Sequence, residues 1–295
     1  MAPIRSDDIG DRLKAFRMAS GMNADVIAAR LGISRAALYR YEKGEVAKID
    51  TLERFADLLQ VSVPTLLGVG VEYISSAVAF FERMRQIEET VEHIIVLFGP
   101  VSYLLTSDAY DSVLEQVLVE SIPDAVHARD RAVSEVCEII TILKERKKTY
   151  RQRQPSIVSL IAESELDRFL RNGLVGRADL PSRTRKRRRQ LAAAEVECAV
   201  AIMESEPIGV QIGIVRDTLP HASFQIFRQP DRPVLAVSPF RLGEQPNVRI
   251  GVAMITSAPE AISLHEQTAE ELWSRALKGK EAATFTRAVI KKHAI

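Results

Sequence analysis

The stretch "VIAARLGISRAALYRYEKG", residues 26–44, decides how the N-terminal part of the chain folds. It contains two short runs of helical periodicity, and Asn23 and Ser34, residue types that cap helix N-termini, stand before them. Gly32 ends the first run and Gly44 follows the second, as glycine commonly does at helix C-termini. The side chains expected to face inward are Val26, Ile27, Leu31, Leu38 and Tyr41. The pattern predicts two short helices joined by a tight turn.

The turn between these helices consists only of Gly32 and Ile33. Glycine permits the positive φ that such a turn needs, Ile33 anchors the bend, and the small side chain of Ala28 lets the two helices approach closely. The helices therefore cross steeply, which is the helix-turn-helix arrangement. In that arrangement the second helix enters the DNA major groove by its N-terminal end.

Three further helices are expected around this pair. "SDDIGDRLKAFRMASG", residues 6–21, begins with a Ser–Asp cap and has apolar residues at helical spacing. "DTLERFADLLQV", residues 50–61, and "VPTLLG", residues 63–68, add an amphipathic helix and a short fifth one. Residues 1–69 are thus predicted to form an all-α, five-helix domain.

Over about residues 6–68 the chain resembles the five-helix domain shared by lambdoid phage repressors and bacterial xenobiotic-response-element (XRE) regulators. The most specific parts of the resemblance are "LGISRAALYRYEKG", residues 31–44, with its closing Glu–x–Gly, and "TLERFADLLQVSVPTLL", residues 51–67. The resemblance implies a λ-repressor-like fold and double-stranded DNA as the partner. A packing or protein-binding domain, as in some members of the family, is the alternative reading.

Residues that match the family's DNA-contacting positions are Asn23, Ala24, Ser34, Arg35, Ala36, Ala37, Tyr39, Arg40 and Lys43. Arg35 and Arg40 are the best candidates for reading bases, because a guanidinium fork matches O6 and N7 of guanine. Either Ala36 or Ala37 could contact a thymine methyl group. A single domain with few phosphate contacts binds weakly at physiological salt, so we expect a homodimer on two half-sites about one helical turn apart.

The remaining matched positions concern phosphates and internal structure. Asn23, Ala24 and Lys43 correspond to positions that contact phosphate in the family. Ala24 stands where glutamine is common, so its contact would come from the backbone alone. Arg17 and Glu42 match a pair that forms an internal salt bridge in the family, and the resemblance therefore implies a structural role for them.

Charge is distributed unevenly along a chain whose formal net charge is only +1. Residues 71–140 carry four basic and 13 acidic side chains, whereas residues 141–190 carry 15 basic and five acidic ones. This asymmetry favours contact between the two blocks, within or between chains, as much as contact with a polyanion. The densest basic run is "RTRKRRRQ", residues 183–190, at the start of an expected helix. We expect it to strengthen DNA binding without reading bases.

The middle of the chain is expected to be helical. From residue 72 to residue 98 apolar side chains recur at steps close to the 3.5 of a coiled-coil seam, and a second helix is expected over residues 123–150. A dimer-forming helix and one helix of a larger core both fit the first segment. Gly68 and Gly70 precede it and are interpreted as a hinge. Residues 70–154 are accordingly predicted to be a helical linker and dimerisation region.

After Pro155 short apolar runs bounded by Pro, Gly and Asp predict strands. They are "SIVSLIAES", "IGVQIGIVRD", "ASFQIFRQ", "RPVLAVSP" and "NVRIGVAMITS", and the helices expected among them span 182–204, 259–277 and 281–293. Residues 155–295 therefore read as an α/β domain. In order and pattern this half is similar to the uncharacterised effector domain of actinobacterial helix-turn-helix regulators, which has been compared with the phospholipase D fold. The similarity implies a domain that senses a ligand or a partner.

Motifs for catalysis or metal binding are missing from the sequence. No histidine is followed by lysine two residues later, as a phospholipase D site requires, and no P-loop occurs. His265 and Glu266 begin like a zinc-protease helix, but Ala269 stands where the second ligand belongs. Cys137 and Cys198 have no zinc spacing and are expected to be buried free thiols. We expect no cofactor, no metal and no enzymatic activity.

The sequence thus predicts a cytoplasmic, homodimeric, sequence-specific DNA-binding transcriptional regulator with an effector-sensing C-terminal domain. Its effector is an unknown small molecule or protein, and no membrane segment is expected. Two rival functions remain open: an enzyme tethered to DNA, and an antitoxin-like adaptor that binds protein only.

Overall fold

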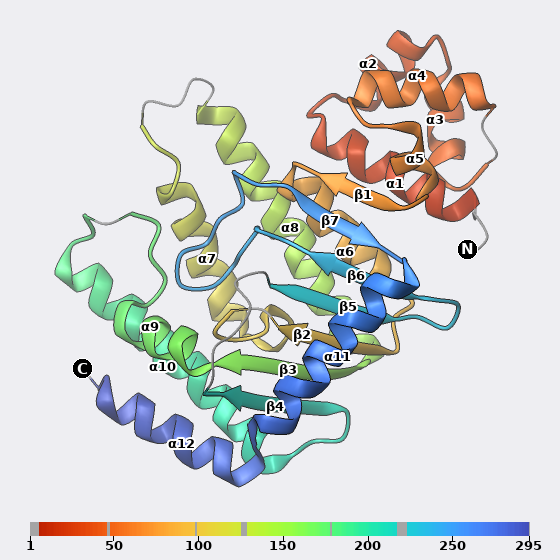
Figure 1. Cartoon of the computed structure of the whole chain (residues 1–295). Coiled ribbons are helices and arrows are strands. Elements are labelled where there is room, and N and C mark those ends of the chain that lie inside the picture. The colour runs from red at the N-terminus through yellow and green to blue at the C-terminus, as the bar shows by residue number, and fades with distance from the viewer. Residues whose placement is uncertain are drawn as a thin grey trace.

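The computed structural model describes residues 6–45, 48–97, 99–124, 129–177, 179–216 and 223–294. Five helices come first, in the places that the sequence predicted, and an eight-stranded sheet with its helices follows (Figure 1). The N-terminal helices are α1 (Ser6–Ala19), α2 (Ala24–Leu31), α3 (Arg35–Glu42), α4 (Ile49–Leu59) and α5 (Val63–Leu67).

The sheet is mixed and runs in the order β1-β7-β6-β5-β2-β3-β4-β8. Its strands are β1 (Val71–Ile74), β2 (His93–Leu97), β3 (Ser156–Ala162), β4 (Val210–Val215), β5 (Phe224–Arg228), β6 (Pro233–Val237), β7 (Ala253–Thr256) and β8 (Leu277–Lys278). Strands β2, β3 and β4 are mutually parallel, and the other pairings are antiparallel. The parallel strands need crossover helices, which then cover a face of the sheet.

Helices pack on both faces of the sheet. They are α6 (Ala77–Glu88), the short 3₁₀ helix η1 (Tyr103–Leu105), α7 (Asp108–Glu120), α8 (Arg129–Arg153), α9 (Glu163–Asn172), α10 (Ser182–Ser205), α11 (Pro259–Arg275) and α12 (Gly279–Lys292). Helix α11 crosses one face diagonally, where its inner side chains pack on β2 to β6 (Figure 1). The helices of the opposite face share the larger hydrophobic cluster.

The long helix expected over residues 72–98 is wrong. Residues 71–74 form β1, residues 77–88 form α6, and residues 93–97 form β2. The segment is a helix between two short strands. The alternating buried residues of the strands, together with the apolar residues of the helix, gave a spacing close to that of a coiled-coil seam. The apolar side chains of α6 are buried in the core, so this segment is a core helix and offers no free seam for a dimer.

The C-terminal predictions agree with the structure in most elements. Strands β3 to β7 lie within the five predicted runs, and α10, α11 and α12 lie close to the three predicted helices. The expected helix over residues 123–150 corresponds to α8, and residues 125–128 of its predicted start lie outside the described residues. The sequence analysis missed β1, β2, β8, α7 and α9.

The charged blocks contact each other within one chain, as the charge pattern suggested. Arg146 forms a buried bidentate pair with Glu88, at 2.7 and 2.9 Å, and Lys147 lies 2.7 Å from Asp111. Such pairs lose much hydration, so they fix the position of α8 more than they add to stability. The two cysteines, however, were predicted wrongly: Cys137 and Cys198 are both exposed, on the outer sides of α8 and α10.

The helical N-terminal part is packed tightly on the sheet. Its core residues, Leu13 and Leu66 among them, belong to the same hydrophobic cluster as Ile74 and Phe80. Helix α1 packs along α6, and α5 packs on β1 (Figure 1). None of the described helices is long and apolar enough to cross a membrane.

Candidate nucleic-acid interface

The two helices of the predicted helix-turn-helix begin with side-chain caps. Asn23 Oδ1 accepts a hydrogen bond from the Val26 amide at 2.9 Å, and Ser34 Oγ accepts one from the Ala37 amide at 3.1 Å. Each cap satisfies an amide that the first helical turn leaves without an intrahelical partner. The starts of α2 and α3 are therefore fixed by the residues that the sequence indicated.

The turn between α2 and α3 has the expected left-handed glycine. Gly32 has φ +62°, and its amide donates to the carbonyl oxygens of Ala28 and Ala29. The Ile33 amide donates to the Ala28 carbonyl at 3.0 Å. Ile27 and Leu38 are fully buried, whereas Val26, predicted to face inward, is 39% exposed. The turn fixes the direction in which α3 leaves α2.

Most of the predicted DNA-contacting residues are exposed. Ala37 is half-buried, and Ala24 is buried, so a contact from Ala24 can come only from its backbone, as the sequence suggested. The exposed residues are Asn23, Ser34, Arg35, Ala36, Tyr39, Arg40 and Lys43. Helix α3 thus presents a polar and cationic surface to solvent.

Arg35 is already ordered in the free protein. Its Nη2 lies 3.2 Å from Tyr39 Oη, its guanidinium lies 5.5 Å from the centre of the Tyr39 ring, and its Nη1 lies 3.3 Å from Asp25 Oδ2. The hydrogen bond to Tyr39 and then the charge of Asp25 raise the pKa of Arg35. The side chain is thereby directed along the outer face of α3, and Asp25 occupies one edge of its guanidinium.

Arg40 also has an acidic partner. Its Nε lies 2.9 Å from Glu45 Oε2, and both side chains are largely exposed. An exposed pair of this kind is weak in water, so the Arg40 guanidinium is readily released from it. The sequence analysis did not identify Asp25 or Glu45, although both acids stand close in sequence to the arginines' helix.

Arg17 and Glu42 form the internal salt bridge that the resemblance implied. Arg17 Nη2 lies 3.2 Å from Glu42 Oε2, and Arg17 Nε also bonds the carboxylate. The pair joins the end of α1 to the end of α3. The orientation of α3 therefore follows that of α1.

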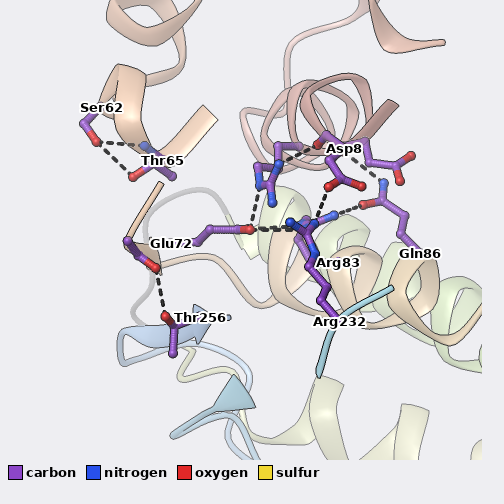
Figure 2. A network of polar contacts seen from close by, with 11 residues as sticks. Asp8, Ser62, Thr65, Glu72, Arg83, Gln86, Arg232 and Thr256 are labelled. Carbon is purple, nitrogen blue, oxygen red and sulfur yellow. Dashed lines mark hydrogen bonds and ion pairs between the residues drawn. The ribbon is translucent and has the colours of Figure 1, made fainter. Parts of the chain in front are cut away.

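Helix α1 is in turn fixed to the sheet by a buried ion cluster, here called the junction cluster, of Arg12, Glu72 and Arg83 (Figure 2). Arg12 Nε donates to Glu72 Oε1 at 2.6 Å, and Arg83 Nε donates to Glu72 Oε2 at 3.0 Å. All three side chains are at most 6% exposed. The cluster joins α1, β1 and α6, elements on both sides of the expected hinge.

Further contacts surround the junction cluster. Gln86 accepts from Arg83 at 2.7 Å and donates to the Asp11 carbonyl at 3.0 Å, and Arg232 pairs with Asp8 (Figure 2). Thr256 Oγ1 donates to the Gly70 carbonyl at 2.8 Å. Gly68 and Gly70 do have positive φ, but contacts bridge the chain on both sides of them, so the expected free hinge is not present. A Cβ on Gly68 would lie 2.2 Å from Arg12 Nη2.

The two guanidinium groups stabilise the charged form of Glu72. Burial alone would raise the pKa of this carboxyl, but the charges and hydrogen bonds of Arg83 and Arg12 outweigh it and hold the pKa below its ordinary value. Glu72 is therefore an anion at neutral pH. The cluster carries two positive charges and one negative charge on side chains that are almost fully buried, so removing Glu72 would take from both arginines the carboxylate that they share.

Residues 8–67 match the family model of a helix-turn-helix domain, a range that begins in α1 and ends with α5. The chain carries an N-terminal helix-turn-helix domain. A search of curated proteins finds no match for the chain. Among solved structures one similar chain is that of TrmBL2, an archaeal chromatin protein whose structure is described as showing a novel mode of DNA binding. It shares 10% sequence identity with this chain at a TM-score of 0.30, and the alignment covers 78% of this chain and 60% of that one.

Proposed function

We propose that the protein is a sequence-specific DNA-binding transcriptional regulator of the XRE, λ-repressor-like type, with no catalytic step of its own. The observation that carries the proposal is the outer face of α3, which presents Arg35, Tyr39 and Arg40 beside the capped N-terminus of α2. Arg35 and Arg40 read bases, and Asn23, Lys43 and the backbone at Ala24 bind phosphates. Ser34, Ala36 and Ala37 lie at the end of α3 that enters the groove.

The protein acts as a homodimer on two half-sites. One domain of this size makes too few phosphate contacts for tight binding at physiological salt. Support for self-association comes from exposed apolar side chains at the β1 end of the sheet. Tyr73 of β1 lies opposite Met254 of β7 in the strand pairing, and Val252 lies just before β7. Tyr73 is 58% and Val252 is 55% exposed. The DNA site should then be a palindrome.

The test is selection of a DNA site from random duplexes by the full chain, followed by affinity measurements on variants. Arg35→Ala and Arg40→Ala should each weaken binding to the selected site by about tenfold or more and relax base preference at one position of each half-site. Arg54→Ala, which removes an exposed arginine of α4 outside the proposed surface, serves as the control. Unchanged affinity and base preference in both α3 variants, or a site without two-fold symmetry, contradict the proposal.

The C-terminal domain senses a small ligand or a partner and changes DNA affinity. Support comes from the junction cluster, because a displacement of β1 or α6 must displace α1 and, through Arg17 and Glu42, also α3. A ligand that prefers one arrangement of the sheet would therefore also prefer one arrangement of the DNA-binding surface.

A further inference from the structure

A cavity of about 480 Å³ opens at the edge of the sheet where β2, β3 and β4 begin. Its other walls are the turn after α10, the end of α11 and the start of α12, close to β8. In the strand order β8 is the edge strand opposite β1, and α10 and α12 lie on that side of the molecule (Figure 1). The helix-turn-helix domain contributes no residue to it. A volume of this size suits a small organic ligand.

One part of the cavity is apolar. Its side chains there are Ile202, Met203, Pro207, Ile208 and Trp273. Ile208 is fully exposed at the mouth, on a turn in which Glu206 has φ +43° and Gly209 has φ +85°. Such a turn holds a large aliphatic side chain in water at the mouth of a cavity that Trp273 also lines, and the apolar part of a ligand would cover both side chains.

Two opposite charges line the same cavity. Lys278 Nζ lies 5.1 Å from the centre of the Trp273 ring. The Glu206 carboxylate lies against the backbone of Gly279, the residue after Lys278, because a Cβ added to Gly279 would be 2.7 Å from Glu206 Oε1. Within the part of the chain that the structure describes, neither Lys278 nor Glu206 forms an ion pair. The cavity is therefore lined by one cation and one anion that do not pair with each other.

The remaining polar groups of the cavity carry no charge at neutral pH. His93 Nδ1 lies 2.6 Å from Ser156 Oγ, and burial, followed by the charge of Arg228, lowers the pKa of His93 below its ordinary 6.5. Gln211 is neutral. Both charged side chains are exposed, so a ligand with one charge can pair with only one of them, whereas a zwitterion can pair with both.

We infer that this cavity binds a free α-amino acid with a large apolar side chain. The ligand's carboxylate pairs with Lys278, its ammonium group pairs with Glu206, and its side chain packs against Trp273, Ile208 and Met203. This inference rests on the proposed function in one respect, since it names the class of effector that the C-terminal domain senses. Binding itself does not depend on DNA.

Trp273 provides a direct readout, because it is the one tryptophan of the chain. The full chain is titrated with L-phenylalanine, with L-leucine, with 3-phenylpropionate, which lacks the amine, and with phenethylamine, which lacks the carboxylate, while tryptophan fluorescence is followed. Both amino acids should give a saturable change, and each single-charged analogue should bind at least about tenfold more weakly than phenylalanine. No saturable change with either amino acid, or an analogue that binds as tightly as phenylalanine, overturns the inference.

Variants locate the site. Lys278→Met and Glu206→Gln should each weaken amino-acid binding by about tenfold, and Lys280→Met, an exposed lysine two residues further on that does not line the cavity, should leave it unchanged. Circular dichroism checks that each variant is folded. An equal loss in all three, or a loss in none, counts against the assignment.

Affinity for the selected DNA site is then measured with and without saturating L-phenylalanine. A change in DNA affinity that Lys278→Met abolishes supports an effector role, and no change means that the amino acid is not the effector. Failure of the Arg35 and Arg40 test would leave the fluorescence titration unaffected. The two proposals therefore fail separately.

Discussion

Arg35 shows at the level of single residues how the free protein prepares its proposed DNA-binding surface. Tyr39, one turn further along α3, holds the guanidinium by a hydrogen bond and by its ring. Because the side chain is already ordered, less rotamer entropy is lost when a base is bound. Asp25 opposes this, since its carboxylate occupies one edge of the guanidinium and repels phosphate.

Asp25→Asn should therefore raise the affinity for the selected DNA site severalfold, most clearly at low salt, with little change in the unfolding midpoint, because the pair with Arg35 is exposed. Asp57→Asn on α4 is the matched control, since it removes the same charge from an exposed position of the same domain. Binding assays at two salt concentrations check the difference. An equal gain in both variants would mean that only net charge matters.

At the scale of one element, the basic run in the first turns of α10 contains two kinds of cation: some bond to other parts of the protein, and others face solvent without an ion pair to a described residue. Arg188 is buried, with its Nη2 2.5 Å from Glu120 Oε1, and Arg189 Nη2 donates to the His293 carbonyl at 3.0 Å. Three of the exposed side chains of the run, Arg183, Lys186 and Arg187, form no ion pair with any described residue. The positions of these residues around α10 decide which cations are bonded to the rest of the protein and which face solvent.

Replacing Arg188 by glutamine should lower the free energy of unfolding by about 1–3 kcal/mol, because Glu120 loses its buried partner. The triple variant Arg183→Gln, Lys186→Gln, Arg187→Gln should leave that free energy within about 0.5 kcal/mol and reduce the salt dependence of DNA binding without changing the preferred site. Urea unfolding and binding at several salt concentrations measure both. A stability loss in the triple variant, or a new site preference, would refute this division.

At the scale of the whole molecule the helix-turn-helix domain and the sheet are joined by a shared hydrophobic cluster and by buried ions. Besides Glu72, the carboxyl of Glu82 lies at this junction, 3.2 Å from Lys14, and its burial is outweighed by Arg85 and Lys14, so its pKa is also below the ordinary value. A carboxyl with a lowered folded-state pKa stabilises the fold above its unfolded pKa and loses that effect as pH falls through the folded value.

The junction should consequently weaken at acid pH. Above the ordinary glutamate pKa of 4.5 we expect the two parts to unfold together, and as the pH is lowered below it, amide exchange should rise in residues 6–68 before it rises in the sheet. Glu72→Gln should show this separation already at pH 7, whereas Glu53→Gln, an exposed residue of α4, should not. Hydrogen exchange by mass spectrometry makes the comparison. Uniform exchange at low pH would contradict the role of the junction.

The sequence by itself determined the elements whose signals are local. The caps Asn23 and Ser34, the turn at Gly32 and the periodicity around them indicated α2 and α3, because caps, positive φ and helical faces depend on residues within a few positions. The exposure of Arg35 and Arg40 agrees with the positions that the family resemblance implied. Strands β3 to β7 were similarly marked by short apolar runs between turn residues.

Only the tertiary structure decided what depends on distant partners. Strand β1 has four residues and pairs with β7, which lies about 180 residues further along the chain, so no local pattern distinguished it from the start of a helix. The junction cluster joins Arg12, Glu72 and Arg83 from three elements, and the cavity at Trp273 joins Glu206 and Lys278, which lie far apart in the sequence. Burial and charge pairing between such residues depend on how distant segments pack, and the spacing of neighbouring residues in the sequence does not determine that packing.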